Sequence, residues 1–462
     1  MDFKSLNSVY FIGIGGIGMS GLARYFADNG VVVAGYDRTP SAVTDSLSRM
    51  GVDVIFEDNP EKLPENIDLV IYTPAVKDEL NIIKALVKKG LEFVKRAEVL
   101  GWISKTMPTI AVAGTHGKTT VTSMLVHIMK SAGIRICGFV GGVTKNYLSN
   151  YVGDKNPQWM VVEADEFDRS FLNLEPYYGI ITSMDADHLD IYENHHSLNE
   201  AFFQFMKKIN KDGHLILKEG LPYPVNIKTP IITYNASGKG ADIITGNIES
   251  KDMINNYDVD GIINVGNIEL KVPGLHNIEN SLAAITIAWL LGIEADIITR
   301  AVNSYEGVLR RFDIRYNNND IIYIDDYAHH PEELKALISA VRVLLPGKRI
   351  TGVFQPHLYS RTRDFADEFA TSLELLDELI LLDIYPARER PIDGITSNML
   401  LKKINLKEKK ILKKEQLVEF LRTKRFEVLL TLGAGDIDRM VEPLTEMIRQ
   451  KTNIYTNGKE NF

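Results

Sequence analysis

The sequence is poor in cysteine and in positive charge. Its single cysteine, Cys137, excludes an internal disulfide and is compatible with a reducing compartment. Because Cys137 follows a predicted helix among apolar residues, we expect a buried structural thiol rather than a nucleophile. Lys and Arg number 52 against 61 Asp and Glu, which gives a formal net charge of -9 at pH 7. Nucleic-acid binding requires a basic face, so this balance argues against nucleic acid as the main partner.

Long apolar runs are also missing. The longest, from Leu282 to Ile293, is interrupted by Thr286 and Gly292 and is too short to span a bilayer. The N-terminus has no basic region followed by an apolar stretch of the signal type. We therefore expect a cytoplasmic protein that does not bind membranes. The 462 residues are 45% apolar and 24% charged, as in ordinary globular proteins, and this length predicts roughly two to four domains.

The chain does contain a glycine-rich loop between a predicted strand and a predicted helix. After the strand Thr109–Ala113 comes the Gly114 loop, Gly114-Thr115-His116-Gly117-Lys118-Thr119-Thr120. A strand that turns through glycines into a helix aims backbone N–H groups at one point, which suits a phosphate chain. In such a loop Lys118 contacts the outer phosphates and the Thr119 hydroxyl binds Mg²⁺. Val112 stands where the full spacing has a glycine, so the motif is shortened, and a glycine turn with an incidental Lys-Thr pair is the alternative.

A second glycine-rich loop lies near the N-terminus. After the predicted strand Val9–Ile12, the Gly13 loop, Gly13-Ile14-Gly15-Gly16-Ile17-Gly18, opens a helix, and Asp37 lies nineteen residues after Gly18. This spacing matches the dinucleotide fingerprint, in which an acid binds a ribose. A nucleotide-sugar diphosphate would use the same N–H groups, and a tight turn without a ligand is the third interpretation. Arg96 places a cation beside this loop or else belongs to a solvated face.

Polar residues end two further predicted strands. Glu163 follows the strand 158–162, and His188 lies in an acidic loop after the strand 179–183. A carboxylate at a strand end beside a phosphate loop provides a second Mg²⁺ contact, so Glu163 is the predicted ligand. His188 is a candidate for a second divalent ion, although a lone histidine is usually structural. We expect residues 165–166, Asp and Glu, to cap a helix or to face solvent.

Two asparagines open another predicted helix. Asn277 and Asn280 lie at i, i+3, so both amides could face a flat polar group such as adenine. Helix capping is the competing interpretation for Asn277. Farther along, Arg310 and Arg311 are two cations that could reach ATP phosphates. The polar, strand-like stretch 235–272 between these motifs and the preceding ones predicts a small β insertion.

The last segment alternates predicted strands and helices, which indicates a parallel, doubly wound sheet. Four of its strands end in polar clusters, at the edge where ligands collect in such sheets. These clusters begin at Asp325, Gln355, Tyr385 and Gly433.

Taken in order, the motifs of the chain resemble those of the Mur ligase family. They are Gly-Ile-Gly-Gly-Ile-Gly-Met-Ser-Gly from Gly13, Gly-Thr-His-Gly-Lys-Thr-Thr from Gly114, Glu-Ala-Asp-Glu from Glu163, Ala-Asp-His from Ala186, His-Asn-Ile-Glu-Asn from His276, Asp-Asp-Tyr-Ala-His-His-Pro from Asp325 and Phe-Gln-Pro-His from Phe354. The resemblance implies an α/β fold in three domains. These are a Rossmann-like UDP-sugar domain over 1–105, a central P-loop ATPase-type domain over 106–312, and a doubly wound, Rossmann-like amino-acid domain over 313–462.

The resemblance also implies an activity, the ATP-dependent ligation of L-alanine to the carboxylate of UDP-N-acetylmuramate through an acyl phosphate, with Mg²⁺. This is a cytoplasmic step of peptidoglycan synthesis, which serves cell-wall biogenesis, cell shape and cell division, and we expect a monomer or a weak homodimer. One alternative is a ligase of the same family that adds a recycled tripeptide to the same UDP-sugar. Another is an NAD-dependent oxidoreductase built on the Gly13 loop, which leaves Lys118 and Glu163 unexplained. A third is a nucleotide-binding regulatory protein without turnover.

The predicted roles combine the residues of each motif with the resemblance, which implies the roles of Lys118, Thr119, Glu163, His188, Asn280, Asp326, Tyr327, His357 and Arg361. Together they predict catalysis by Lys118, His188, His357 and Arg361; ATP binding by Gly114, Thr115, His116, Gly117, Lys118, Thr119, Thr120, Asn280, Arg311 and Asp326; UDP-sugar binding by Gly13, Gly15, Gly16, Gly18, Met19, Asp37 and Arg96; amino-acid binding by Tyr327, His357 and Arg361; and Mg²⁺ ligation by Thr119, Glu163 and His188.

The chain departs from the family pattern at two places. Several relatives carry a carbamylated lysine after the Ala-Asp-His loop, and the matching stretch here, Ala201–Gln204, has no lysine. Some relatives have Arg directly after the Gln-Pro-His histidine, where this chain has Leu358. We therefore expect differences at the second metal site and at one substrate contact.

Overall fold

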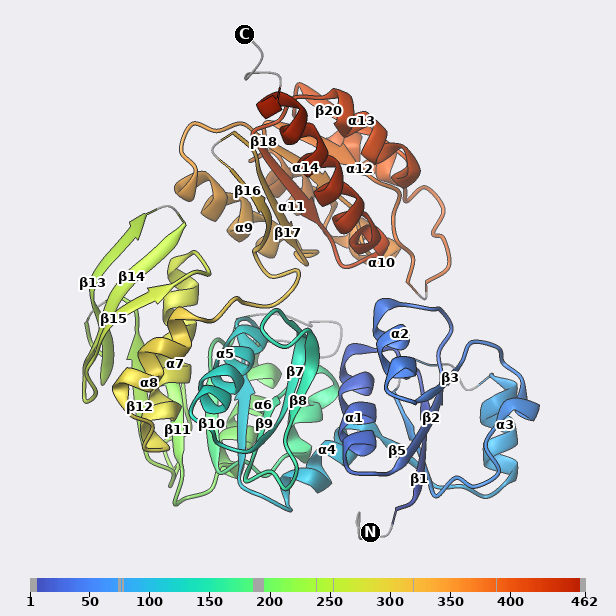
Figure 1. Cartoon of the computed structure of the whole chain (residues 1–462), viewed down its shortest axis with the longest axis vertical. Coiled ribbons are helices and arrows are strands. Elements are labelled where there is room, and N and C mark those ends of the chain that lie inside the picture. Colours follow the sequence, from blue (N-terminus) through green and yellow to red (C-terminus); the bar gives the residue numbers. More distant parts are fainter. Residues whose placement is uncertain are drawn as a thin grey trace. The chain divides into compact units, whose positions relative to one another are not determined.

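The computed structural model describes residues 6–73, 76, 79–185, 195–237, 239–251, 253–318, 320–387 and 389–457. These residues form three successive α/β regions, each with its own sheet (Figure 1). Two compact units contain them, one ending at Val308 and the other beginning at Leu309, and the first unit holds two of the sheets. The predicted fold class, three α/β domains with mostly parallel sheets, is confirmed. The limits of the three domains stay a prediction.

The first sheet is parallel throughout, with the strand order β3-β2-β1-β4-β5. The order reverses between β1 and β4, and in such sheets ligands bind beyond the carboxyl ends of the strands at the reversal. The Gly13 loop directly follows β1 and therefore lies at this point. The elements are β1 (Ser8–Ile12), α1 (Ile17–Asp28), β2 (Val32–Tyr36), α2 (Ala42–Arg49), β3 (Asp53–Ile55), β4 (Leu69–Tyr72), α3 (Asn81–Lys88), β5 (Phe93–Lys95) and α4 (Arg96–Ser104).

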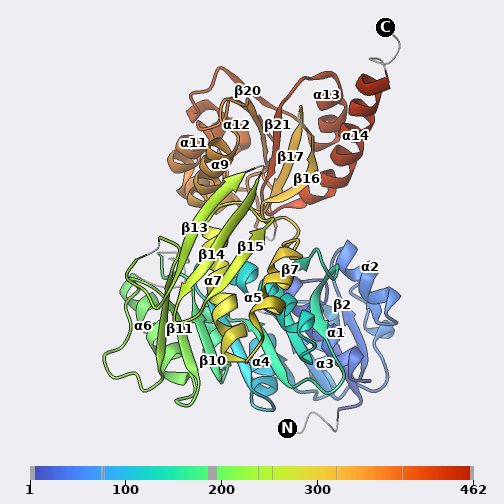
Figure 2. The same cartoon turned by 60° about the vertical axis from the view of Figure 1, so that its left-hand side comes forward.

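The central sheet has the order β15-β14-β13-β12-β11-β10-β6-β9-β7-β8. Every residue of β6 is buried, which explains its continuous run of small and β-branched side chains. The predicted β insertion is the antiparallel set β13–β15 at one edge (Figure 2). The elements are β6 (Thr109–Ala113), α5 (Lys118–Ser131), β7 (Ile136–Thr144), β8 (Ser149–Gly153), β9 (Trp159–Glu163), β10 (Tyr178–Ile181), α6 (His195–Lys208), β11 (His214–Lys218), β12 (Ile231–Asn235), β13 (Ile243–Lys251), β14 (Ile254–Gly261), β15 (Val265–Leu270), α7 (Leu275–Leu290) and α8 (Ala295–Asn303).

Helix α1 joins the first sheet to the central one, because it packs against β7 and β8. Tyr25 of α1 contacts the rings of Phe139 and Tyr151, with centroids 5.7 and 6.2 Å apart. At the start of the helix, the buried Asn150 of β8 donates a hydrogen bond to the carbonyl oxygen of Ile17 (2.5 Å). The helix that the Gly13 loop opens is therefore anchored to the sheet that carries the Gly114 loop.

The third sheet has the order β16-β17-β21-β18-β19-β20, with only β16 antiparallel to its neighbour. The four polar clusters predicted from the sequence follow β17, β18, β19 and β21, which are consecutive parallel neighbours, so they meet at one edge. None of the described helices has the length and apolar character needed to cross a membrane. The elements are β16 (Asp313–Asn317), β17 (Ile322–Asp326), α9 (Pro331–Leu344), β18 (Ile350–Phe354), α10 (Tyr359–Asp364), α11 (Ala366–Leu373), β19 (Glu378–Leu381), α12 (Ser397–Lys403), β20 (Glu408–Ile411), α13 (Leu417–Thr423), β21 (Val428–Leu432) and α14 (Val441–Asn457).

Candidate functional site

The Gly114 loop, between β6 and α5, has the backbone that its glycines predict. Gly114 and Gly117 adopt positive φ angles of 135° and 82°. A Cβ atom on Gly117 would lie 2.5 Å from Asn280 Oδ1, and one on Gly114 would collide with Thr182 Oγ1. Because α5 begins at Lys118, the amides of its first turn have no acceptor within the helix and can bind an anion.

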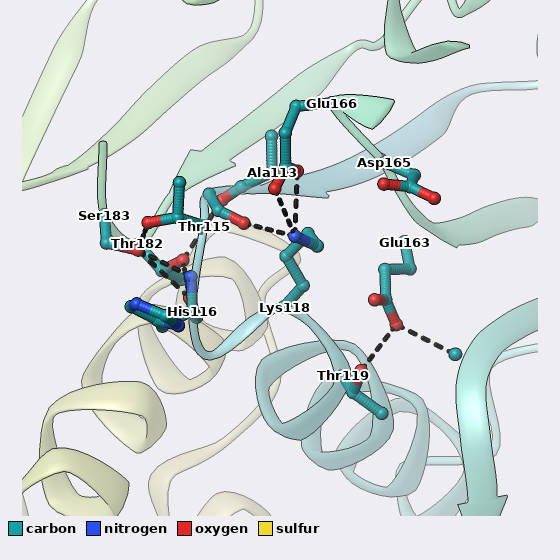
Figure 3. Close-up of polar contacts among 12 residues, drawn as sticks. Ala113, Thr115, His116, Lys118, Thr119, Glu163, Asp165, Glu166, Thr182 and Ser183 are labelled. Carbon is teal, nitrogen blue, oxygen red and sulfur yellow. Dashed lines mark hydrogen bonds and ion pairs between the residues drawn. The ribbon is translucent and has the colours of Figure 1, made fainter. Parts of the chain in front are cut away.

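Hydroxyl groups at the end of β10 hold this loop in shape. Thr115 Oγ1 and Ser183 Oγ are 2.8 Å apart, and the His116 amide donates to Ser183 Oγ (2.7 Å; Figure 3). Thr182 Oγ1 donates to the carbonyl oxygen of Ala113 (3.2 Å). The His116 amide therefore supports the loop itself. Thr182 and Ser183 were not predicted as site residues, although they are hydroxyl residues at the end of a strand that is rich in β-branched and apolar side chains.

Lys118 is bound by a buried carboxylate. Its Nζ donates to Glu166 Oε1 (2.9 Å), to Glu166 Oε2 (2.8 Å) and to the Gly114 carbonyl oxygen (2.6 Å; Figure 3). Burial disfavours the ammonium, but the neighbouring carboxylates, Glu166 first, outweigh it and raise the pKa of Lys118. The expectation that Glu166 caps a helix or faces solvent is wrong. Its side chain is fully buried, because the turn after β9 directs it into the Gly114 loop.

Thr119 and Glu163 form an oxygen pair beside this ion pair. Thr119 Oγ1 donates to Glu163 Oε2 (2.9 Å), which also accepts the Gly141 amide (2.8 Å). Hydroxyl and carboxylate oxygens suit Mg²⁺, which keeps several waters when a protein binds it. His188, the third predicted ligand, lies outside the described residues. Among the residues that are described, no three His, Cys, Asp or Glu side chains converge as a metal site.

The two asparagines of α7 differ in their partners. Asn277 Nδ2 donates to the carbonyl oxygen of Pro273 (2.7 Å), which is a local contact at the helix start. Asn280 is also buried, and its Oδ1 lies against Gly117 of the Gly114 loop. The fold thus brings Asn280, predicted to bind ATP, to the phosphate loop, while Asn277 stabilises the end of its own helix.

The Gly13 loop is held by the backbone at the end of β2 and by one acid. The amides of Gly13 and Ile14 donate to the Tyr36 carbonyl oxygen (2.8 and 3.0 Å), and the Gly15 amide donates to Asp37 Oδ2 (2.7 Å). Helix α1 begins after Gly16 without a side-chain cap, so its N-terminus can bind an anion. Asp37, predicted to bind a ribose, supports the loop in this structure.

Arg96, the first residue of α4, reaches the Gly13 loop. A Cβ atom on Gly18 would collide with Arg96 Nη1, and Arg96 Nη2 is 3.9 Å from Asp165 Oδ2. Met19, in contrast, is only 2% exposed and packs in the hydrophobic core of the region. Of these two predicted ligand contacts, the fold brings Arg96 to the loop and directs Met19 to the core.

In the unit that begins at Leu309, two aspartates end β17. Asp326 is buried, and its carboxylate accepts the amides of Phe312 (2.6 Å) and Ala328 (2.8 Å). Burial raises the pKa of Asp325 to about 6, although Arg310, whose Nε lies 3.3 Å away, acts in the opposite direction. Asp326, predicted to bind ATP, thus shapes the loop that carries the next predicted residues.

Aromatic rings and cations gather beyond these aspartates. The guanidinium groups of Arg310 and Arg311 lie 5.2 and 5.4 Å from the centre of the Tyr327 ring. The His329 ring is 5.0 Å from Tyr327 and 5.8 Å from the His357 ring. Arg311, predicted to reach ATP, therefore stacks on a residue predicted to bind the amino acid.

Arg361 lies in α10, after the residue Leu358. Leu358 has a positive φ of 71°, and the turn it makes leads into the helix. Arg361 Nη1 is buried and has no hydrogen-bond partner among the described residues. A buried, unsatisfied guanidinium donor is costly, and a ligand carboxylate would satisfy it.

Three family models match the chain in succession. They are described as the Mur ligase family catalytic domain over residues 8–107, the Mur ligase middle domain over 112–288, and the Mur ligase glutamate ligase domain over 310–435.

Curated relatives match over almost the full length. A protein of Parabacteroides distasonis named UDP-N-acetylmuramate–L-alanine ligase is 45% identical over 455 residues, which covers 97% of this chain and 98% of the relative. A protein of Flavobacterium johnsoniae with the same name is 44% identical and covers 97% and 100%.

Solved structures of related enzymes share the fold. The crystal structure of UDP-N-acetylmuramate–alanine ligase from Thermotoga maritima superposes with a TM-score of 0.81 at 27% identity, over 96% of this chain and 99% of that one. A murein peptide ligase from Psychrobacter arcticus superposes with a TM-score of 0.71 at 23% identity, over 95% and 98%.

Proposed function

The chain belongs to the Mur ligase family, and from this we propose that it joins L-alanine to the carboxylate of UDP-N-acetylmuramate while ATP is converted to ADP and phosphate. The observation that carries the proposal is the presence of two strand–glycine–helix loops in one compact unit. The Gly114 loop has Lys118, and the Gly13 loop has Arg96 beside it. Relatives whose names state this activity also match the chain almost end to end.

The Gly114 loop is the proposed ATP site. A carboxylate is a poor acyl donor, so its oxygen must first be phosphorylated to become a leaving group. Transfer of a phosphoryl group depends on positioning and charge neutralisation. Lys118 and the first-turn amides of α5 bind the phosphates, and Asn280 contacts the adenine. Thr119 and Glu163 would hold Mg²⁺, which would supply charge neutralisation at the phosphates.

The Gly13 loop is the proposed UDP-sugar site. The N-terminus of α1 and the Arg96 guanidinium bind the diphosphate, which is retained throughout the reaction. Asp37 keeps the loop in shape through the Gly15 amide.

The residues after β17 and β18 form the proposed alanine site. Arg361 binds the alanine carboxylate through the donor that has no partner among the described residues, and Tyr327 and His357, which both contact the His329 ring, lie beside the substrate. The neutral amine of alanine attacks the acyl phosphate. The new C–N bond replaces the C–O bond to phosphate, which leaves, and the nitrogen loses a proton.

The proposed reaction is a step of peptidoglycan synthesis, and we propose that the protein carries it out in the cytoplasm. We propose that it works with Mg²⁺, on small-molecule substrates and as a monomer or a weak homodimer.

Phosphate release tests the proposal. Purified protein is incubated with MgATP and UDP-N-acetylmuramate, together with L-alanine, the murein tripeptide or neither. We expect release that depends on both the UDP-sugar and L-alanine. Release with the tripeptide alone would indicate the other ligase of the family, and no release in any mixture would contradict the proposed activity.

A further inference from the structure

The ammonium of Lys118 has no donor left for a phosphate. An ammonium carries three N–H bonds. In this structure they are directed to two oxygens of Glu166 and to the Gly114 carbonyl oxygen, at 2.9, 2.8 and 2.6 Å. A lysine that binds nucleotide phosphates in this loop must therefore release at least one of these partners.

Of the two partners, Glu166 is the one that an anion can replace. The Gly114 carbonyl belongs to the loop backbone, whose shape is held by Thr182 and Ser183. Glu166 instead carries a negative charge, so it competes with a phosphate for the same cation. Its side chain is 0% exposed while it is paired with Lys118, so this competition takes place inside the loop and not at the surface.

The pair also changes the electrostatics of the loop. A lone lysine would give the N-terminus of α5 one full positive charge, whereas the Lys118–Glu166 pair is neutral. A neutral pair attracts phosphates less strongly at the binding stage, because the carboxylate cancels part of the attraction. The same carboxylate keeps the long lysine side chain in one orientation across the loop.

We propose that Glu166 is a positioning residue that holds Lys118 in place of a nucleotide, and that nucleotide binding breaks at least one Lys118–Glu166 hydrogen bond. The proposal rests on the proposed function in one respect, the assignment of the Gly114 loop to ATP. It predicts that Glu166 lowers the affinity for nucleotide while it raises the rate of phosphoryl transfer. A residue that only stabilised the fold would not separate these two effects.

The test is a calorimetric titration of the full-length protein with MgADP, combined with steady-state kinetics. Glu166→Gln removes the charge and keeps the size of the side chain. We expect MgADP to bind about tenfold more tightly to this variant, which corresponds to the loss of one charged competitor. The kcat for alanine-dependent phosphate release should fall about tenfold, because a neutral amide holds the ammonium less firmly.

Two further variants make the result specific. Glu166→Asp keeps the charge but is one methylene shorter, so it cannot hold Lys118 with both oxygens, and MgADP should bind about twofold more tightly. Asp165→Asn removes a charge from the same turn, where the side chain is 40% exposed and lies near Arg96. This control should change the MgADP affinity by less than about twofold.

Wild-type protein is titrated in the same series. If it does not bind MgADP, the assignment of the Gly114 loop to ATP fails, whatever the variants do. If it binds and the folded Glu166 variants bind MgADP equally or more weakly, the inference about Glu166 is overturned while the proposed function stands. Thermal melting identifies which variants are folded, and Glu166→Asp decides the question if Glu166→Gln is not.

Discussion

The Gly13 loop and the Gly114 loop have the same backbone plan but obtain their positive charge differently. In both, a buried strand runs through glycines into a helix whose first-turn amides can bind an anion. The Gly13 loop has no cation of its own, and Arg96 reaches it from α4. The Gly114 loop has Lys118 on its own helix, paired with Glu166 and next to the oxygen pair of Thr119 and Glu163.

On the proposed assignments, the glycines build a phosphate site and the side chains around it determine which chemistry takes place there. A cation brought from another element is sufficient to hold a diphosphate that stays bound. A lysine fixed by a carboxylate, with a metal-binding oxygen pair beside it, suits a phosphoryl group that moves. The following variants test this division, beginning with the largest expected effect.

Removal of the Lys118 ammonium should have the largest effect, because it should lower the rate of phosphate release without changing the affinity for the UDP-sugar. In Lys118→Ala, alanine-dependent phosphate release should fall by about 10²-fold or more, as when one electrostatic stabiliser of a transition state is lost. The affinity for UDP-N-acetylmuramate, measured by calorimetry, should stay the same because we propose that this ligand binds at the Gly13 loop.

Lys130 provides the matched control, since it lies at the other end of α5 and pairs with Asp154. Lys130→Ala should change the rate by less than about twofold. Near-normal turnover in Lys118→Ala would show that the Gly114 loop is not the reacting site.

The proposed contact of Thr119 with Mg²⁺ predicts the next effect. Thr119→Val removes the hydroxyl and keeps the shape, so about tenfold more Mg²⁺ should be needed for half-maximal activity. Thr122→Val is the control on the same helix, because the Thr122 hydroxyl is buried without a hydrogen-bond partner among the described residues. An equal shift of the Mg²⁺ titration in both variants would contradict a contact between the Thr119 hydroxyl and Mg²⁺.

A substitution of Arg96 tests the role of the Gly13 loop. Arg96→Ala should raise the KM for UDP-N-acetylmuramate about fivefold through loss of a charged contact to the diphosphate, with the KM for ATP unchanged. Lys95→Ala changes the exposed neighbour and should leave both constants unchanged. A rise in the KM for ATP alone would contradict the assignment of Arg96 to the Gly13 loop.

The smallest effect is expected at Asp37. Asp37→Asn keeps an oxygen that can accept the Gly15 amide, so the KM for UDP-N-acetylmuramate should rise only about threefold. A loss of more than a hundredfold would instead indicate direct contact of the carboxylate with the ligand.

The sequence predicted the two loops because each depends on local features. Strand, glycine and helix signals lie within a few residues of one another, and Glu163 is the last residue of its strand. The family resemblance, which rests on seven such motifs, is confirmed by the three family models.

The parts that the sequence did not predict depend on contacts between distant segments. Glu166 was expected to cap a helix or face solvent, but the direction of its side chain is set by the turn after β9 and by Lys118, 48 residues earlier. Ser183 reaches the Gly114 loop only because β10 lies beside β6 in the central sheet. Asn150 likewise meets α1 across a boundary between two sheets, which no local pattern reveals.

The most direct test of the account is whether one chain binds two different diphosphates at the same time. Equilibrium binding of UDP-N-acetylmuramate and MgADP, each measured with and without a saturating amount of the other, provides it. The account predicts one equivalent of each ligand per chain and no displacement of one by the other. Competition for a single site, or tight binding of a nicotinamide cofactor in place of both, would contradict it.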